Sequence, residues 1–173
     1  TATTSTCVTG LVTLPTVSTW SMFGQIVILL LIQIGGLGII TIMSGLMLLL
    51  NRKMGIGDRL LIQDAFNLNT MSGLAKFVKN VLFGTLIIEA IGAILYMLVF
   101  VPEFGAKGIW ISVFNSVSAF CNAGFDVVGV ISPGTSLMAF NHDPVVCITL
   151  MVLISVAGLG FFVWEEVVRL HSW

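Results

Sequence analysis

Charged residues are scarce in this sequence, and their scarcity excludes an ordinary soluble domain. Only 9% of the 173 residues are charged, and the first charge along the chain is Arg52. An average globular domain is about 25% charged. A soluble fold of this length needs a polar surface that a chain with 57% hydrophobic residues cannot supply. The composition therefore predicts an integral membrane protein in contact with the lipid bilayer.

Several functional patterns are also missing. The seven Lys and Arg residues form no basic cluster, which excludes nucleic acid as a partner. Cys7, Cys121 and Cys147 show no CxxC or other metal-binding spacing, so we interpret them as small apolar residues. Glu89 is the one charged residue inside a long apolar segment, and no Cys/His cluster or Ser-His-Asp set accompanies it. We therefore expect neither an enzyme nor an organic cofactor.

Long apolar segments dominate what is present. Phe23–Leu50 has twenty-eight residues without a charge, Val81–Val101 has twenty-one with Glu89 alone, and Val145–Trp164 has twenty with none. About 20 apolar residues in a helix cross a bilayer core of roughly 30 Å. We therefore predict an all-α membrane protein with three spans, the third continuing to residue 168. The first span is over-long and glycine-rich near its middle, so it should tilt or kink.

A fourth apolar stretch, Ile109–Phe125, is short and ends in Asn-Ala-Gly. A segment of this length is more typical of a re-entrant or interfacial element than of a span. Non-helical backbone is tolerated at membrane depth only where protein buries it or where it lines a water-filled cavity. We predict a half-helix that enters the membrane and an extended loop that returns.

The basic residues predict the orientation. Only Lys107 follows the second span, and the other Lys and Arg residues follow the first or the third. The positive-inside rule assigns that majority to the cytoplasm, so we expect a multi-pass protein of the cell membrane. Both glycine-centred loops then open on the outer face. The cytoplasmic set is Arg52, Lys53, Arg59, Lys76, Lys79 and Arg169.

The stretch 51–80 is the one long polar part of the chain. Within it, "DRLLIQDAFN" (58–67) places apolar residues at helical spacing and predicts an amphipathic segment. Two interpretations stay open: the segment lies at the cytoplasmic interface of the membrane, or it is a docking surface for a cytosolic partner.

The two halves of the chain resemble each other. "LIQIGGLGII" (31–40) aligns with "LISVAGLGFF" (153–162) at an offset of 122, and Gly10 pairs with Gly124 at an offset of 114. Each half is therefore interpreted as a re-entrant loop, a glycine-centred turn and a spanning helix. Membrane proteins built from repeats commonly place the substrate path at the repeat axis. The first repeat would begin before Thr1, so we expect the chain to be part of a longer protein.

The two glycine-centred loops, "CVTG" (7–10) and "CNAG" (121–124), carry no charge. Glycine adopts positive φ without a Cβ penalty, which lets successive carbonyl groups point to one side. Rings of such carbonyls replace the water shell of K⁺ in selectivity filters. A half-helix ending at the loop would add negative potential. The pattern predicts a cation site made of backbone oxygens. The resemblance described next implies that the ion is K⁺, with no other metal.

Four stretches together resemble the Trk/Ktr/HKT superfamily of potassium transporter membrane subunits, of the bacterial Ktr or Trk type: "TSTCVTGL", "FGQIVILLLIQIGGLGI", "DRLLIQDAFN" and "SAFCNAGFD". The resemblance implies four M1–P–M2 units around one pore, of which this chain holds two, the first without its M1. Residues 1–50 would be the end of the first P-loop, its filter and M2. Residues 51–80 would be a cytoplasmic linker, and 81–173 the second unit, with M1 at 81–101, pore helix and filter at 109–125, and M2 at 145–168.

The resemblance also assigns residues and partners. It implies a homodimer on a cytosolic ring of nucleotide-binding regulatory subunits. Two units are missing, together with the gate and the basic residue that family members carry in them, so the chain supplies half of a pore wall. The missing units are expected in the same full-length chain. The implied filter residues are Val8, Thr9, Gly10, Asn122, Ala123 and Gly124, with Cys7, Cys121 and Phe125 as accessory neighbours.

Other polar residues keep two interpretations. Glu89 is part of the ion path, or it is a structural residue that is hydrogen-bonded to a neighbouring helix or protonated. Asp126 either concentrates cations at the outer mouth or caps the loop. His142 and Asp143, before Pro144, are expected to form the N-terminal cap of the third span. The glycines of both GLG motifs are either hinges or sites of close helix packing.

These observations predict potassium uptake driven by the membrane potential, without covalent chemistry. Whether Na⁺ is coupled or excluded stays open. The competing hypothesis is a non-conducting fragment or a subunit that only scaffolds helices.

Overall fold

The computed structural model describes residues 1–11, 14–38, 41, 57, 74–128, 136–161 and 163–164. The remainder of the first predicted span after residue 41, the amphipathic segment 58–67 and residues 165–173 lie outside this set. Throughout the described ranges the regular structure is helical, with no strand, as an all-α membrane protein requires. The elements are α1 (Ala2–Thr6), α2 (Thr16–Thr19), α3 (Met22–Leu37), α6 (Leu74–Phe104), α7 (Ala106–Phe120), the 3₁₀ helix η1 (Ser136–Phe140) and α8 (Pro144–Gly158).

Helix α6 is the long apolar element. Its segment Val78–Phe104 is the one helix in the described part of the chain that is long and apolar enough to cross a membrane. The helix extends beyond the predicted 81–101 at both ends. Residues 74–80 contain neither Gly nor Pro, so nothing among them breaks the helix before Val81. Pro102 falls in the final turn, where it removes a single backbone bond.

The α6–α7 turn folds the chain tightly back on itself. Gly105 has φ of 60° and ends α6, and its N–H donates to the Val101 carbonyl at 2.9 Å. A Cβ on Gly108 would lie 2.2 Å from the Phe100 carbonyl oxygen. Only glycine permits this approach, so the first turn of α7 packs directly on the last turns of α6.

Helices α3 and α8 are apolar but shorter than a full span, at sixteen and fifteen residues. The structure confirms that Asp143 caps α8: its carboxylate accepts the Val145 N–H at 2.8 Å and the Val146 N–H at 3.3 Å. α3 ends at a glycine of the GLG motif, Gly38, with φ of 80°. The predicted irregularity of the first span therefore falls at this motif.

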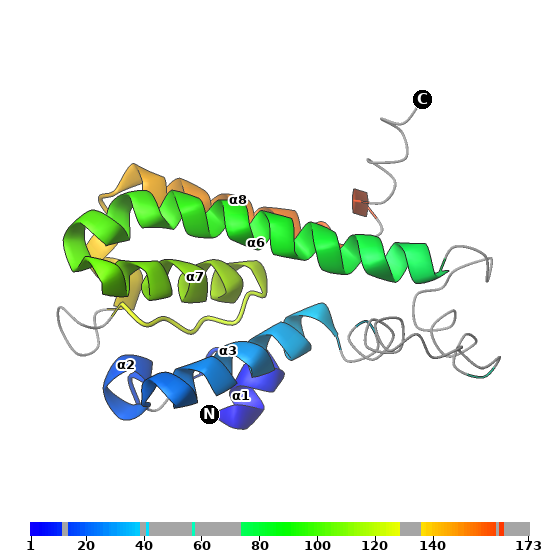
Figure 1. Ribbon diagram of the computed structural model, residues 1–173, viewed down its shortest axis with the longest axis horizontal. Helices are drawn as coiled ribbons and strands as arrows, with labels where there is room; N and C mark the ends of the chain where they lie inside the picture. Colours follow the sequence, from blue (N-terminus) through cyan, green and yellow to red (C-terminus); the bar gives the residue numbers. More distant parts are fainter. Residues whose placement is uncertain are drawn as a thin grey trace.

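The helices form two groups with the second glycine-centred loop between them (Figure 1). α7 and α8 both pack on α6, α1 packs on α3, and α3 meets α7. The core between these helices is strongly aromatic, while the outward faces of α3, α6 and α8 carry many exposed apolar side chains. Exposed apolar faces of this extent suit a lipid environment. The largest fully buried core side chains are Tyr96, Phe100 and Phe114.

Candidate functional site

The two glycine-centred loops share one backbone conformation. We call residues 7–10 the first loop and residues 121–126 the second loop. Gly10 has φ of 71° and Gly124 has φ of 68°. Two positions earlier, the non-glycine residues Val8 and Asn122 also have positive φ, at 54° and 57°. A non-glycine residue with positive φ is uncommon. Two such pairs at the predicted offset of 114 show that the loops are structural repeats.

The hydrogen bonds of the two loops repeat in the same register. α1 ends at Thr6 and α7 at Phe120, each directly before a cysteine in the right-handed helical region. The Thr9 N–H donates to the Thr4 carbonyl at 3.0 Å, and the Ala123 N–H donates to the Ser118 carbonyl at 2.8 Å. Each helix therefore ends in a turn that releases the following carbonyl groups from helical bonding.

The two loops contact each other at their glycines. A Cβ added to Gly10 would lie 2.8 Å from the Ala123 carbonyl oxygen, and one added to Gly124 would lie 3.1 Å from the Cα of Gly10. Thr9, Asn122 and Gly124 are exposed, whereas Ala123 is fully buried. The predicted filter residues of both repeats therefore meet at one place.

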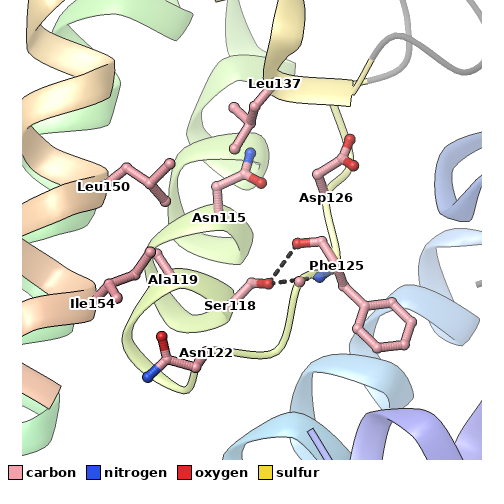
Figure 2. A pocket seen from close by; sticks show the side chains of 10 residues that line it. Asn115, Ser118, Ala119, Asn122, Phe125, Asp126, Leu137, Leu150 and Ile154 are labelled. Carbon is pink, nitrogen blue, oxygen red and sulfur yellow. Dashed lines mark hydrogen bonds between the residues drawn. The ribbon is translucent and has the colours of Figure 1, made fainter. Parts of the chain in front are cut away.

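A hydroxyl group closes the second loop. The Phe125 N–H donates to Ser118 Oγ at 3.0 Å, and Ser118 Oγ–H donates to the Phe125 carbonyl (Figure 2). Phe125 is anchored in the core, with 2% of its surface exposed. Asp126 accepts the Val128 N–H at 3.2 Å, which supports the loop-capping interpretation of this residue. Ser118 thus holds the residues on both sides of Gly124: its hydroxyl binds Phe125, and its carbonyl accepts the Ala123 N–H.

A cavity of about 330 Å³ adjoins the second loop on the α8 side. Figure 2 shows Asn115, from α7, among the side chains that line it. Asn115 is 2% exposed, and neither its Oδ1 nor its Nδ2 has a hydrogen-bond partner among the described residues. Leu137, Leu150 and Ile154 form the apolar part of the lining. A buried amide without hydrogen bonds costs free energy. The described residues therefore supply no hydrogen-bond partner for the Asn115 side chain at this cavity.

A polar cluster lies on the other side of the second loop. Gln33 Nε2 donates to both carboxylate oxygens of Glu89, at 3.0 Å each, and Cys121 Sγ lies 4.0 Å from Gln33 Oε1 and from Glu89 Oε1. Glu89 is 5% exposed. The structure thus shows the hydrogen-bonded alternative for Glu89. Ser116 Oγ also donates to the Glu89 carbonyl at 2.7 Å.

Two glycines of α3 allow this close packing. A Cβ on Gly36 would lie 2.4 Å from Cys121 Sγ, and a Cβ on Gly35 would lie 2.1 Å from the Thr6 carbonyl oxygen. Packing is therefore the observed role of these two positions. Gly38 and Gly160, in contrast, have positive φ, and a Cβ at either position would meet no described atom within 4 Å, so they break the helices rather than pack them.

A second tie joins the halves nearer the start of α3. Trp110 Nε1 donates to Gln25 Oε1 at 2.8 Å, while Gln25 Nε2 donates to the Trp20 carbonyl at 3.2 Å. Gln25 and Gln33 both lie on α3 and both reach the second repeat. Sequence reasoning missed Gln25, Gln33 and Ser118. The sequence did offer one indication of these residues: each places an amide or hydroxyl group within an otherwise apolar segment.

No metal centre is formed by side chains in the described ranges, where no three His, Cys, Asp or Glu residues gather. The exposed residues at the meeting point of the loops are instead Thr9, Asn122 and Gly124, which offer only neutral backbone and side-chain oxygens. Such neutral oxygens suit a weakly bound monovalent cation better than a transition metal.

Comparison with known proteins identifies the family. The profile of the TrkH family, described as cation transport protein, matches residues 1–170, so the chain belongs to this family. The resemblance seen in the sequence is confirmed, and so is the expectation of a transport protein rather than an enzyme.

Three relatives show the extent of the match. The chain is 42% identical to the potassium/sodium uptake protein NtpJ of Enterococcus hirae over 172 residues, covering 99% of this chain and 37% of that protein. It is 36% identical to the Ktr system potassium uptake protein B of Bacillus subtilis, covering 98% and 37%. It is 35% identical to the protein of the same name from Vibrio alginolyticus, covering 98% of this chain and 36% of that protein. The chain therefore spans little more than a third of the length of these relatives.

Proposed function

We propose that this chain forms part of the ion path of a potassium uptake protein, with the backbone carbonyls of the two loops as ligands. The contact between Gly10 and Gly124 carries the proposal, because it brings two uncharged segments of one conformation, residues 7–10 and 121–124, to a single point. α7 ends at Phe120, directly before the second loop, so its carbonyl end adds a negative potential that favours a cation. The proposed filter residues are Val8, Thr9, Gly10, Asn122, Ala123 and Gly124.

The same proposal covers the organisation of the whole protein. α6, α7 and α8 correspond to M1, pore helix and M2 of one unit, and α1 and α3 to the end of the preceding pore helix and its M2. Two further units in a longer chain would complete the pore. A multi-pass position in the cell membrane, a homodimer and a cytosolic nucleotide-binding regulatory subunit belong to this proposal. The length of the relatives and the uptake activities in their names support it.

A second candidate function is uptake of Na⁺ as well as K⁺. The relative from Enterococcus hirae is named a potassium/sodium uptake protein, and it is 42% identical to this chain. Both ions would use the same carbonyl groups, so relative uptake distinguishes the two candidates. A protein that only scaffolds helices would show neither flux.

The test is Gly124→Ser in a complete transporter that contains this chain, expressed in cells that lack their own potassium uptake. At φ of 68° a serine is strained, and its Cβ would lie 3.1 Å from the Cα of Gly10. We expect the variant to lose its preference for K⁺ over Na⁺. Gly105→Ser is the matched control, because Gly105 also has positive φ but has no described atom within 4 Å of its Cβ position. Unchanged K⁺ uptake and preference in Gly124→Ser would refute the filter assignment.

A further inference from the structure

We propose that Glu89 and Gln33 are positioning residues for ion selectivity: they hold the start of the second loop at Cys121 without touching the ion. The inference rests on the proposed function, since it concerns the same loop. It assigns a role to the buried polar cluster on the α3 side of that loop.

The first step is that Glu89 faces the protein interior. Its side chain is 5% exposed, and both of its oxygens accept from Gln33 Nε2 at 3.0 Å. A carboxylate that lined the ion path would lie on the exposed side of the second loop, with Asn122 and Gly124. Glu89 instead meets an amide from α3, fifty-six residues away in sequence. It therefore connects the two repeats.

The second step is the contact with the loop. Cys121 Sγ lies 4.0 Å from Gln33 Oε1 and from Glu89 Oε1, so the thiol sits against both members of the pair. Cys121 directly follows α7 as its C-terminal cap, and Asn122 follows it with positive φ. A shift of Cys121 is therefore passed directly to the first proposed ligand of the second repeat.

The third step is that the backbone of α6 at Glu89 is also bound to α7. Ser116 Oγ donates to the Glu89 carbonyl at 2.7 Å, which ties α7 to α6 one turn before the loop. The absence of a Cβ at Gly36 lets α3 approach Cys121. Three helices thus converge on one cysteine, and the Gln33–Glu89 pair is the polar link among them. Such a link fixes the position of the second loop relative to the first loop along α3. An ion site shared by both loops depends on this relative position.

The experiment compares four substitutions in the complete transporter: Glu89→Ala, Gln33→Ala, their double variant and Glu89→Gln. Glu103→Gln is the matched control, because Glu103 is an exposed carboxylate on the same helix. The first readout is the ratio of the K⁺ and Na⁺ KM values, with the maximal rate and the amount of folded protein measured separately. A merely structural defect lowers the amount and the maximal rate and leaves the KM ratio unchanged.

The second readout follows the loop without using transport. Cys121 is buried, so maleimide labelling of the peptide that carries it reports on loosening of the loop. Cys147, on α8, is partly exposed and hydrogen-bonded to the Asn141 carbonyl, and its peptide in the same sample is the internal reference.

We expect each alanine substitution to reduce the preference for K⁺ by up to about tenfold, the value of one net intramolecular hydrogen bond. The double variant should lose no more than either single one, since both remove the same link. Glu89→Gln keeps an acceptor for Gln33 Nε2 and should restore the parent KM ratio. Cys121 should label faster in both alanine variants than in the parent and the Glu103→Gln control.

Three results would overturn the inference. An unchanged KM ratio in Glu89→Ala would show that the pair has no effect on selectivity. Glu89→Gln behaving like Glu89→Ala would show that the charge itself acts on the ion. Unchanged Cys121 labelling would show that the loop is not held by the pair. Failure of the proposed function is distinguishable, because Gly124→Ser would then leave the preference intact while Cys121 labelling still reports whether Glu89 holds the loop.

Discussion

Gly10 and Gly124 face each other across the two repeats, so closely that a Cβ on Gly124 would lie 3.1 Å from the Cα of Gly10. The residues are 114 positions apart in sequence, and both have positive φ. The contact explains why glycine is required at these positions for two separate reasons, backbone conformation and space. Each reason can be tested separately.

Gly10→Ala should destabilise the protein more than Gly38→Ala. Both residues have positive φ, so each alanine costs about 1–2 kcal/mol of backbone strain. Only at Gly10 does the new Cβ also meet another group, the Ala123 carbonyl oxygen at 2.8 Å. Thermal unfolding of the purified protein in detergent measures the difference. Equal unfolding temperatures would mean that the two loops do not touch as described.

Ser118→Ala should loosen the second loop. The substitution leaves the Phe125 N–H and carbonyl without their partner in a buried site, at a cost of about 1–3 kcal/mol for each unsatisfied group. Ser112→Ala is the control, because Ser112 is buried on the same helix but donates only to the Gly108 carbonyl, one turn before it. We expect a lower unfolding temperature and faster amide exchange at Phe125 for Ser118→Ala alone. Similar exchange in both variants would contradict a closing role for this hydroxyl.

Trp110→Phe should weaken the tie between α3 and α7. It removes the indole N–H that donates to Gln25 Oε1 at 2.8 Å, and the expected loss of unfolding free energy is about 1 kcal/mol. A double-mutant cycle with Gln25→Leu measures the coupling of the pair. Trp20→Phe serves as the control, since Trp20 accepts from Gln25 through its backbone carbonyl, which the substitution keeps. Additive effects of Trp110→Phe and Gln25→Leu would show that the bond contributes nothing.

Gly36→Ala should push α3 away from the second loop. The added Cβ would lie 2.4 Å from Cys121 Sγ and 2.6 Å from its Cβ, and such overpacking costs about 1–3 kcal/mol. Cys121→Gly removes both of those atoms, so the double variant should recover most of the lost stability.

Gly84→Ala is the comparison for this experiment. It also adds a methyl group to an apolar helix, but its nearest neighbour is 3.8 Å away. Alanine favours helix over glycine by about 1 kcal/mol, so this variant should be neutral or more stable. A Gly36→Ala protein as stable as Gly84→Ala would contradict the close packing of α3 on Cys121.

Local sequence features predicted the local features of the fold. The small uncharged residues around Gly10 and Gly124 indicated two turns of one kind, and the repeat offset of 114 reappears in their dihedral angles. Asp143 before Pro144 predicted the cap of α8. These features depend on neighbours within a few residues, so the chemistry that decides them is visible in the sequence.

Long-range pairs could not be predicted in this way. Nothing in the residues around Gln33 indicates that its partner is Glu89, because the pairing depends on how α3 crosses α6 and α7. The ends of α6 were also missed, since a helix continues into polar residues such as Lys79 without any change in periodicity. Whether the six proposed filter residues bind K⁺ stays a prediction, and the Gly124→Ser experiment tests it.

The two loops differ in one respect that follows from Ser118. At the corresponding position of the first repeat, the Thr4 hydroxyl donates to the Thr1 carbonyl at 2.8 Å, and Leu11, the counterpart of Phe125, is exposed. Ser118 of α7 thus holds the second loop closed. This loop should keep its backbone conformation whether or not an ion is bound at the proposed filter. In the first loop the Thr9 hydroxyl donates to the Thr4 carbonyl at 3.4 Å, but no described side chain of α1 holds Leu11, so this loop should be the more compliant of the two. In the proposed filter, the first loop should therefore be the one that changes conformation most easily.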